Sequence, residues 1–211
     1  MYSINITNVY YNLHQIMKVL NYISDNNEMK QGVVVVMTTH VIDTKNNNKA
    51  NIKELPIAVI KNWKLLYEKE YVIQYPGNWR LEQSGKMGLT FILYSQSSSN
   101  PDRFDKNVNL LVQDLKGKKM RLDKYVEISE KQVKTEIAYG TILESKRIYN
   151  GDNNYHKLLY TGNTGIFKFK FLQYYWIKNE KAYVLTLTCD INEFDCYKET
   201  AEKVMNSFAL Q

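Results

Sequence analysis

The sequence predicts an α+β protein in which helices cover a mainly antiparallel β-sheet. Strand-like apolar runs follow one another from residue 64 to residue 189, and tight turns join most of them. Short connections favour antiparallel neighbours, because a parallel pair needs a long crossover. The 17 tyrosines, 7 phenylalanines and 3 tryptophans among 211 residues also favour strands and sizeable buried contacts. Helices on both faces of such a sheet would make an α/β/α sandwich.

The strand periodicity begins in the segment Tyr71–Trp79. Tyr71, Ile73 and Tyr75 alternate there, and Pro76–Gly77–Asn78 then predicts a turn. The Asn150–Gly151 step between two apolar runs predicts a hairpin, and Gly162–Gly165 predicts another turn. The remaining predicted strands are Trp79–Gln83, Leu89–Ser95, Asn107–Leu115, Ile142–Tyr149, Tyr155–Thr161, Phe167–Lys178 and Ala182–Cys189.

Two helices are predicted within this series of strands. Asp123 suits the N-cap of the first, which runs through apolar residues at helical spacing to Ile137. The second has the clearest amphipathic pattern in the chain and should close one face of the sheet. Its apolar positions are Phe194, Tyr197, Ala201, Val204, Met205 and Phe208.

Residues 1–65 follow a different pattern and are predicted to form an N-terminal helix-plus-strand extension, with residues 66–211 as the main domain. Residues 12–23 have amphipathic helical spacing, and Val33–Ile42 is a continuous β-branched run. Ile52–Trp63 is predicted to be a connector with at most one helical turn. Because so short a piece holds too little core to fold alone, we expect it to pack against the main sheet.

The net charge of +6 is modest and predicts no nucleic-acid partner. Its densest cluster is Lys116, Lys118, Lys119 and Arg121 around Gly117. Such a cluster is typical of a solvated hairpin loop, and a phosphate-binding patch is the alternative. No aromatic residues alternate with these cations, as they do in single-strand binders.

Neither a membrane span nor a signal peptide is predicted. No segment reaches the 18 apolar residues of a span, and the first residues lack a charged region followed by an apolar one. The sequence as given therefore predicts a cytoplasmic location. Cys189 and Cys196 have no CxxC spacing and no adjacent histidine, so they are expected to be two buried or half-buried thiols, or a disulfide if the protein is exported.

The sequence predicts no catalytic residue and no cofactor. His14, His40 and His156 share no ligand spacing, and the serines at 95 and 97–99 lack a nucleophile-elbow motif. Asp152 and His156 are a weak candidate pair for a divalent cation, against the alternative of an unliganded strand histidine. A metal-dependent or hydrolytic enzyme with a site near this pair is therefore an alternative function.

The segment Phe167–Lys178 offers a candidate binding surface. In an extended strand, Tyr174 and Trp176 share a face with Lys168 and Lys170. Both faces of the second half of this strand are apolar, so a helix or a partner should cover the Tyr174–Trp176 side. A recognition surface and burial under the chain's own helix are the two interpretations.

Several short motifs follow one another between about Tyr71 and Leu210. They are Tyr75–Pro76–x–x–Trp79, Asn107–Leu110, Leu122–x–x–Tyr125, Ile142–Ser145, Asn150–Gly151, Tyr155 with Tyr160, Lys181–Tyr183 and Ser207–Phe208. Their order and spacing together resemble the family of PsbP-like and Mog1-like domains.

This resemblance implies an antiparallel sheet between helices and a binding or accessory module rather than an enzyme. Photosynthetic members support the manganese cluster of photosystem II by retaining its ions, the Mog1 branch binds a small GTPase, and many bacterial relatives are envelope proteins. We therefore expect a non-catalytic domain that recognises a protein partner. A structural role in the cell envelope is a further alternative. The start of the chain differs from the family's usual leader, which argues against a photosystem role.

Overall fold

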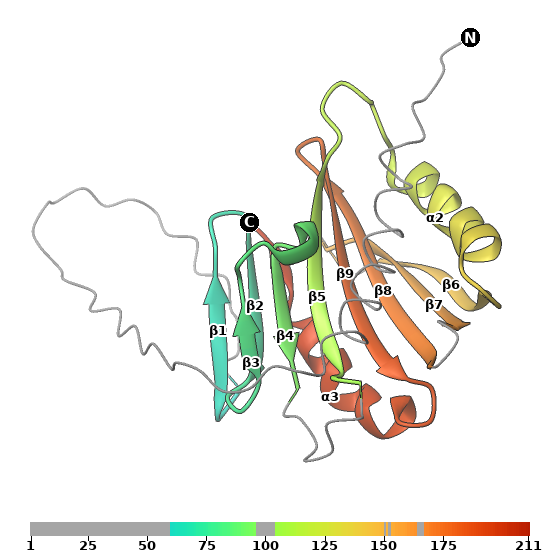
Figure 1. Ribbon diagram of the computed structural model, residues 1–211. Coiled ribbons are helices and arrows are strands. Elements are labelled where there is room, and N and C mark those ends of the chain that lie inside the picture. The colour runs from blue at the N-terminus through green and yellow to red at the C-terminus, as the bar shows by residue number, and fades with distance from the viewer. Residues whose placement is uncertain (1–59, 96–103, 150, 152, 164–166) are drawn as a thin grey trace, which may run out of the picture.

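The computed structural model describes residues 60–95, 104–149, 151, 153–163 and 167–211. In this part of the chain, two antiparallel sheets and two long helices make up the fold (Figure 1). The helices are α2, Leu122–Glu136, and α3, Phe194–Asn206, with a short 3-10 helix η1 at Lys86–Gly88. The strands are β1 Trp63–Tyr67, β2 Tyr71–Pro76, β3 Arg80–Glu82, β4 Phe91–Tyr94, β5 Asn107–Asp114, β6 Thr141–Ile148, β7 Tyr155–Asn163, β8 Lys168–Lys178, β9 Lys181–Asp190 and β10 Ala209–Leu210.

The larger sheet has the strand order β3-β4-β5-β9-β8-β7-β6, and the smaller sheet has the order β1-β2-β10. All of their pairings are antiparallel. Asn179 and Glu180 join β8 to β9 with φ values of 51° and 56°. A two-residue turn with two positive φ values matches the twist of the strands that it joins.

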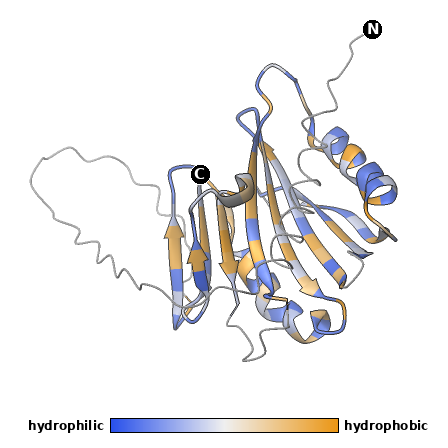
Figure 2. Ribbon diagram, in the orientation of Figure 1, coloured by the Kyte–Doolittle hydropathy of each residue, from blue (hydrophilic) through white to orange (hydrophobic). Residues whose placement is uncertain are grey.

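The two helices lie on opposite faces of the larger sheet. Helix α2 packs against β6, β7 and β8, whereas α3 packs against β9 on the other face and against β2 of the smaller sheet. Hydrophobic and hydrophilic residues alternate along many of the strands (Figure 2), as expected for layers covered on each side. The predicted α+β class and α/β/α layering are confirmed.

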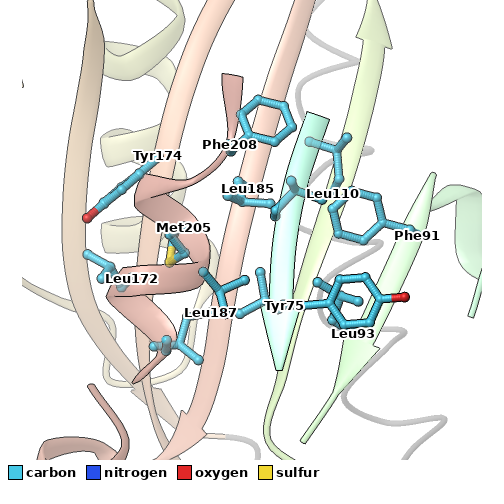
Figure 3. Close-up of a cluster of buried hydrophobic side chains, with 14 of the residues drawn as sticks. Tyr75, Phe91, Leu93, Leu110, Leu172, Tyr174, Leu185, Leu187, Met205 and Phe208 are labelled. Carbon is cyan, nitrogen blue, oxygen red and sulfur yellow. The ribbon is translucent and has the colours of Figure 1, made fainter. Parts of the chain in front are cut away.

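Two apolar cores result from this layering. One lies between the larger sheet, the smaller sheet and α3, where Leu172, Leu185 and Met205 are fully buried (Figure 3). The other lies under α2, where Tyr125, Val133 and Tyr160 are fully buried. Strand β8 contributes to both cores, because its alternate residues point to opposite faces.

The segment Tyr71–Trp79 forms β2 and the turn into β3. The backbone N–H of Trp79 donates to the carbonyl oxygen of Pro76 at 2.9 Å, which closes this turn. The Trp79 side chain is 5% exposed and stacks on Tyr197 of α3, with ring centroids 5.6 Å apart. This tryptophan therefore joins the strand turn to the helix that covers it.

The structure corrects three local predictions. Trp63 begins strand β1, which pairs with β2, so it does not belong to a connector. The N-cap of α2 is Arg121 rather than Asp123, which lies in the first helical turn. Gly162 is part of strand β7, where it pairs with Phe169, and not of a turn. The helix and strand predicted within residues 1–65 lie outside the described residues.

Candidate functional site

A groove of about 700 Å³ lies at one end of the larger sheet. It is bordered by the first turn of α2, the end of β6, the two asparagines that precede β7, the end of β8, and β10. These elements are far apart in the sequence. The antiparallel order β8-β7-β6 places the end of β8, the start of β7 and the end of β6 at the same end of the sheet.

The apolar residues that line the groove, called its floor below, are Leu122, Trp176, Ile177, Ala209 and Leu210. Trp176, which is 4% exposed, and Leu210 belong to the core under α3, whereas Ile177 and Leu122 pack against the core under α2. The indole N–H of Trp176 donates to Oδ1 of Asn153 at 2.8 Å, which fixes the ring against the start of β7. Phe208 packs on the Trp176 ring with centroids 4.9 Å apart, so the floor is continuous with the core under α3.

The rim of the groove is mainly basic. Arg147 Nη1 donates to Oδ1 of Asp123 at 3.1 Å, and Arg147 Nε is buried without a partner in the described part of the chain. Lys178 Nζ donates to the carbonyl oxygen of Leu210 at 3.4 Å. Arg121 is exposed at the N-cap of α2, and no side chain caps that end of the helix. Arg121 belongs to the basic cluster that the sequence predicted to lie in a loop.

The two aromatic residues proposed as a recognition surface are core residues in the structure. Tyr174 is 3% exposed and packs against Tyr155 at a centroid distance of 4.6 Å. Trp176 is 4% exposed and also lines the groove. Both side chains point to the α3 face of the sheet and belong to the core there. Of the two interpretations, burial by the chain's own elements therefore describes Tyr174.

The two lysines proposed with them lie at the other end of β8. Lys170 approaches Asp195 of α3 at 3.4 Å, and its ammonium group lies 4.6 Å from the centre of the Phe194 ring. Lys168 is exposed and borders a smaller hollow of about 380 Å³. Strand β8 therefore separates these lysines from the groove, and the four residues do not form one surface.

His156 lies in a hydrogen-bonded chain with Ser145 and Glu130. Nε2 of His156 is 2.8 Å from Oγ of Ser145, and the Ser145 hydroxyl donates to a carboxylate oxygen of Glu130. In a catalytic triad the histidine lies between the serine and the acid, and it accepts the serine proton. Here the serine lies in the middle. A hydroxyl that donates to Glu130 can only accept from His156, so this arrangement links α2 to β6 and β7 without activating the serine.

Burial lowers the pKa of His156 below its ordinary value of 6.5, against the smaller opposing effect of Glu130. Its proposed companion Asp152 lies outside the described residues. Among the residues that the structure describes, no group of three or more His, Cys, Asp or Glu side chains could hold a metal ion.

Cys189 and Cys196 are both free thiols in the structure. Cys189 is buried in the core under α3, and this burial raises the pKa of its thiol to about 12. Cys196 is exposed on α3. Both cysteines are therefore thiols, as expected, but the expectation that both would be at least half-buried is wrong for Cys196.

The sequence patterns did not predict that the groove residues lie close together in space. The Asn150–Gly151 hairpin could have placed Arg147 opposite His156, which is the register that the structure shows. Nothing in the local pattern indicated that the first turn of α2 and strand β10 would border the same groove. Those positions depend on how the helices pack on the sheet.

Several solved structures share this fold. The chain is similar to cyanobacterial PsbP (CyanoP) from Synechocystis sp. PCC 6803, with 14% identity and a TM-score of 0.56 over 72% of this chain and 95% of that one. It is also similar to LpqN of Mycobacterium tuberculosis, with 10% identity and a TM-score of 0.51 over 71% and 90%. A Pseudomonas aeruginosa protein, PA94, matches with 13% identity and a TM-score of 0.50 over 68% and 94%.

The chain therefore has the PsbP-like fold that the sequence motifs indicated. No protein-family model matches the sequence, and no curated protein matches it. No helix in the described ranges is both long enough and apolar enough to cross a membrane.

Proposed function

We propose that this chain, with its PsbP-like fold, is a non-catalytic accessory domain that recognises a protein partner through the groove between α2 and β10. One observation carries this proposal: an apolar floor and a basic rim, supplied by five separate elements, meet in a groove of about 700 Å³. Binding sites have this composition, with apolar surface for affinity and a few convergent polar groups for orientation.

The groove also contains residues of the type that dominate protein interfaces. Aromatic residues and arginine are enriched among the residues that contribute most to binding free energy. Trp176 lies in the floor, and Arg121 and Arg147 lie in the rim. Because the Trp176 ring is held by Asn153 and by Phe208, it would be ordered before a partner arrives. A floor that is already ordered reduces the entropic cost of binding.

The structural neighbours support an accessory role and raise a cell-envelope location as part of the proposal. One of these neighbours, LpqN, is described as involved in cell envelope biogenesis of Mycobacterium tuberculosis. For the present chain, this location is a hypothesis that fractionation of the native host would test. The expected result is recovery of the protein with the envelope fraction, and recovery in the soluble fraction alone would contradict it.

A matched pair of substitutions tests the groove. Asn154 is exposed and borders the groove, whereas Asn192 is exposed beyond the end of β9, at the opposite end of the sheet. Asn154→Trp would obstruct part of the groove, and Asn192→Trp makes the same chemical change elsewhere. Both variants and the wild type should first show the same melting temperature. Each would then be cross-linked in host lysate, and the captured proteins would be identified by mass spectrometry.

We expect one or more proteins to be captured by the wild type and by Asn192→Trp, and to be lost with Asn154→Trp. Equal capture by the two variants would show that the groove does not recognise the partner. Capture of nothing by the wild type, in every cell fraction, would also contradict the proposal.

The alternative function is a hydrolytic enzyme that uses Ser145, His156 and Glu130. The proximity of these three side chains is the observation behind it, although the order of their hydrogen bonds leaves the serine unactivated in this structure. A broad hydrolase screen of the wild type and of Ser145→Ala would decide this. Turnover that Ser145→Ala abolishes would establish the enzyme and contradict the accessory role. For a metal-dependent version near His156, the test is stabilisation by divalent ions in thermal unfolding.

A further inference from the structure

The chemistry of the groove rim indicates what kind of partner segment it would bind, an inference that rests on the proposed function. Three of the described lining residues are cationic, namely Arg121, Arg147 and Lys178. Asp123 is the one carboxylate among the described lining residues, and it already pairs with Arg147 at 3.1 Å. An anionic segment would therefore be complementary in charge to this groove, and a basic segment would be repelled.

Arg147 has hydrogen-bonding capacity that the fold does not use. Its Nε atom is buried and has no partner among the described residues, while its side chain is 29% exposed. Because Nε is closed to solvent, a ligand would contact the exposed part of this guanidinium, in addition to the bond that Arg147 already donates to Asp123. A carboxylate has the planar two-oxygen geometry that fits the edge of a guanidinium.

Two further features on the rim favour anionic oxygen. Oδ1 of Asn153 accepts the hydrogen bond from the indole N–H of Trp176. The amide N–H₂ group of Asn153 is therefore the part of this side chain that can donate to an anion beside the floor. The 15-residue helix α2 begins at the rim with no side-chain cap, so its first-turn N–H groups and the positive end of its dipole face the same region. These features add to the charge of the arginines and the lysine and do not define the site alone.

The other side of the groove suits an extended chain. Strand β10 is an end strand of the smaller sheet in the described part of the protein, and both of its residues line the groove. The Leu210 carbonyl oxygen accepts from Lys178 at 3.4 Å, so a backbone group of β10 points away from β2. An extended segment could pair with this two-residue edge by replacing the Lys178 contact, and its side chains would then lie on alternate sides. The apolar floor lies beside this edge.

We propose that the groove binds an extended acidic segment of the protein partner. A carboxylate side chain would lie among Arg121, Arg147 and the start of α2. An adjacent apolar side chain would pack on Trp176 and Leu210.

A random dodecapeptide library displayed on phage would test this chemistry with the full chain as bait. Peptides would be selected on the wild type and counter-selected on Asn154→Trp, so that only groove binders remain. The expected result is enrichment of Asp or Glu next to an aliphatic or aromatic residue. Enrichment of neutral or basic peptides, or no groove-dependent peptide, would overturn the proposal.

The selected peptides would then be measured by fluorescence anisotropy against a matched pair of charge reversals. Arg121→Glu changes an exposed residue on the rim, and Lys131→Glu changes an exposed residue of α2. The two positions are roughly 15 Å apart along the helix, at about 1.5 Å per residue. We expect Arg121→Glu to weaken binding at least tenfold and Lys131→Glu to change it less than threefold. Equal effects would reduce the interaction to general charge attraction and would overturn the proposal.

Two controls distinguish a peptide carboxylate from inorganic phosphate as the anionic group that the groove binds. Replacing Glu by Gln in the peptide should weaken binding at least tenfold, whereas inorganic phosphate at the concentration of the peptide should not displace it. Displacement by phosphate would overturn the assignment to a peptide carboxylate. Failure of the peptide tests, combined with groove-dependent capture of a protein partner, would reject the acidic segment and leave the proposed function intact.

Discussion

Replacing Trp79 by alanine should strongly destabilise the protein. The side chain is 5% exposed, between the turn after β2 and helix α3. Truncation of a fully buried tryptophan costs roughly 3–5 kcal/mol, from lost transfer free energy and from the cavity left behind. For a protein of this size, about 1 kcal/mol lowers the melting temperature by roughly 2–4 °C, so the expected decrease is roughly 6–20 °C.

The measurement is urea unfolding followed by far-UV circular dichroism, with the slope of the transition checked for constancy. Trp63→Ala is the matched control, because Trp63 is only half-buried on the end strand β1. It should cost less free energy than Trp79→Ala. A double-mutant cycle with Tyr197→Ala should give a coupling of about 0.5–1.5 kcal/mol for the stacked pair. A Trp79→Ala protein as stable as the wild type would refute the assignment of this residue to the core.

Three further outcomes are expected. Gly140→Ala should lower the free energy of unfolding by about 1–3 kcal/mol, because a Cβ atom there would lie 1.9 Å from the carbonyl oxygen of Val133. Urea unfolding measures this change. An unchanged urea midpoint would contradict the close packing at Gly140. In native protein a maleimide should label one of the two cysteines, the exposed Cys196, and unfolding should expose the buried Cys189 as a second; two rapidly labelled thiols in the native state would contradict this. The lowered pKa of His156 means that its contribution to stability is complete above the ordinary value of 6.5 and is lost as the pH falls below it. The loss of stability between pH 7 and pH 5 should therefore be smaller in His156→Gln than in the wild type, and equal losses would contradict the burial of this ring.

The proposed groove would let surface that the fold already orders contribute to partner binding. Trp176 and Leu210 of its floor belong to the core under α3, and the Trp176 ring is held there by Phe208. Its rim carries the charge that gives specificity. The same division of roles predicts that substitutions in the rim change selectivity with little effect on stability, whereas substitutions in the floor change both.

Most of the fold could be predicted from local patterns in the sequence. Strand β5 and helix α3 follow the predicted ranges closely, because each has a repeating apolar face that only one type of secondary structure can bury. The short strands β1 and β10 were missed. Strand β10 has two residues, too few for any periodicity. It forms because the chain that leaves α3 lies along the edge of β2 and pairs with it.

The sequence also showed that both faces of β8 must be covered, since aromatic or aliphatic residues occupy both sides of its second half. It did not show what covers them. In the structure, Phe208 packs on Trp176 and Tyr155 packs on Tyr174, and these contacts bring together residues separated by 32 and 19 positions in the chain. Such contacts depend on the complementary shapes of distant side chains, which no local pattern contains.

The sequence by itself therefore determined the layers of this protein, through the period of its apolar residues and its turn residues. Only the tertiary structure decided where a site could form. Arg121, Arg147 and Lys178 are ordinary exposed or half-exposed cations in the sequence, and they border one groove because three elements end at the same place. Periodicity specifies which face of an element is buried, whereas the meeting of element ends depends on how whole layers pack against one another.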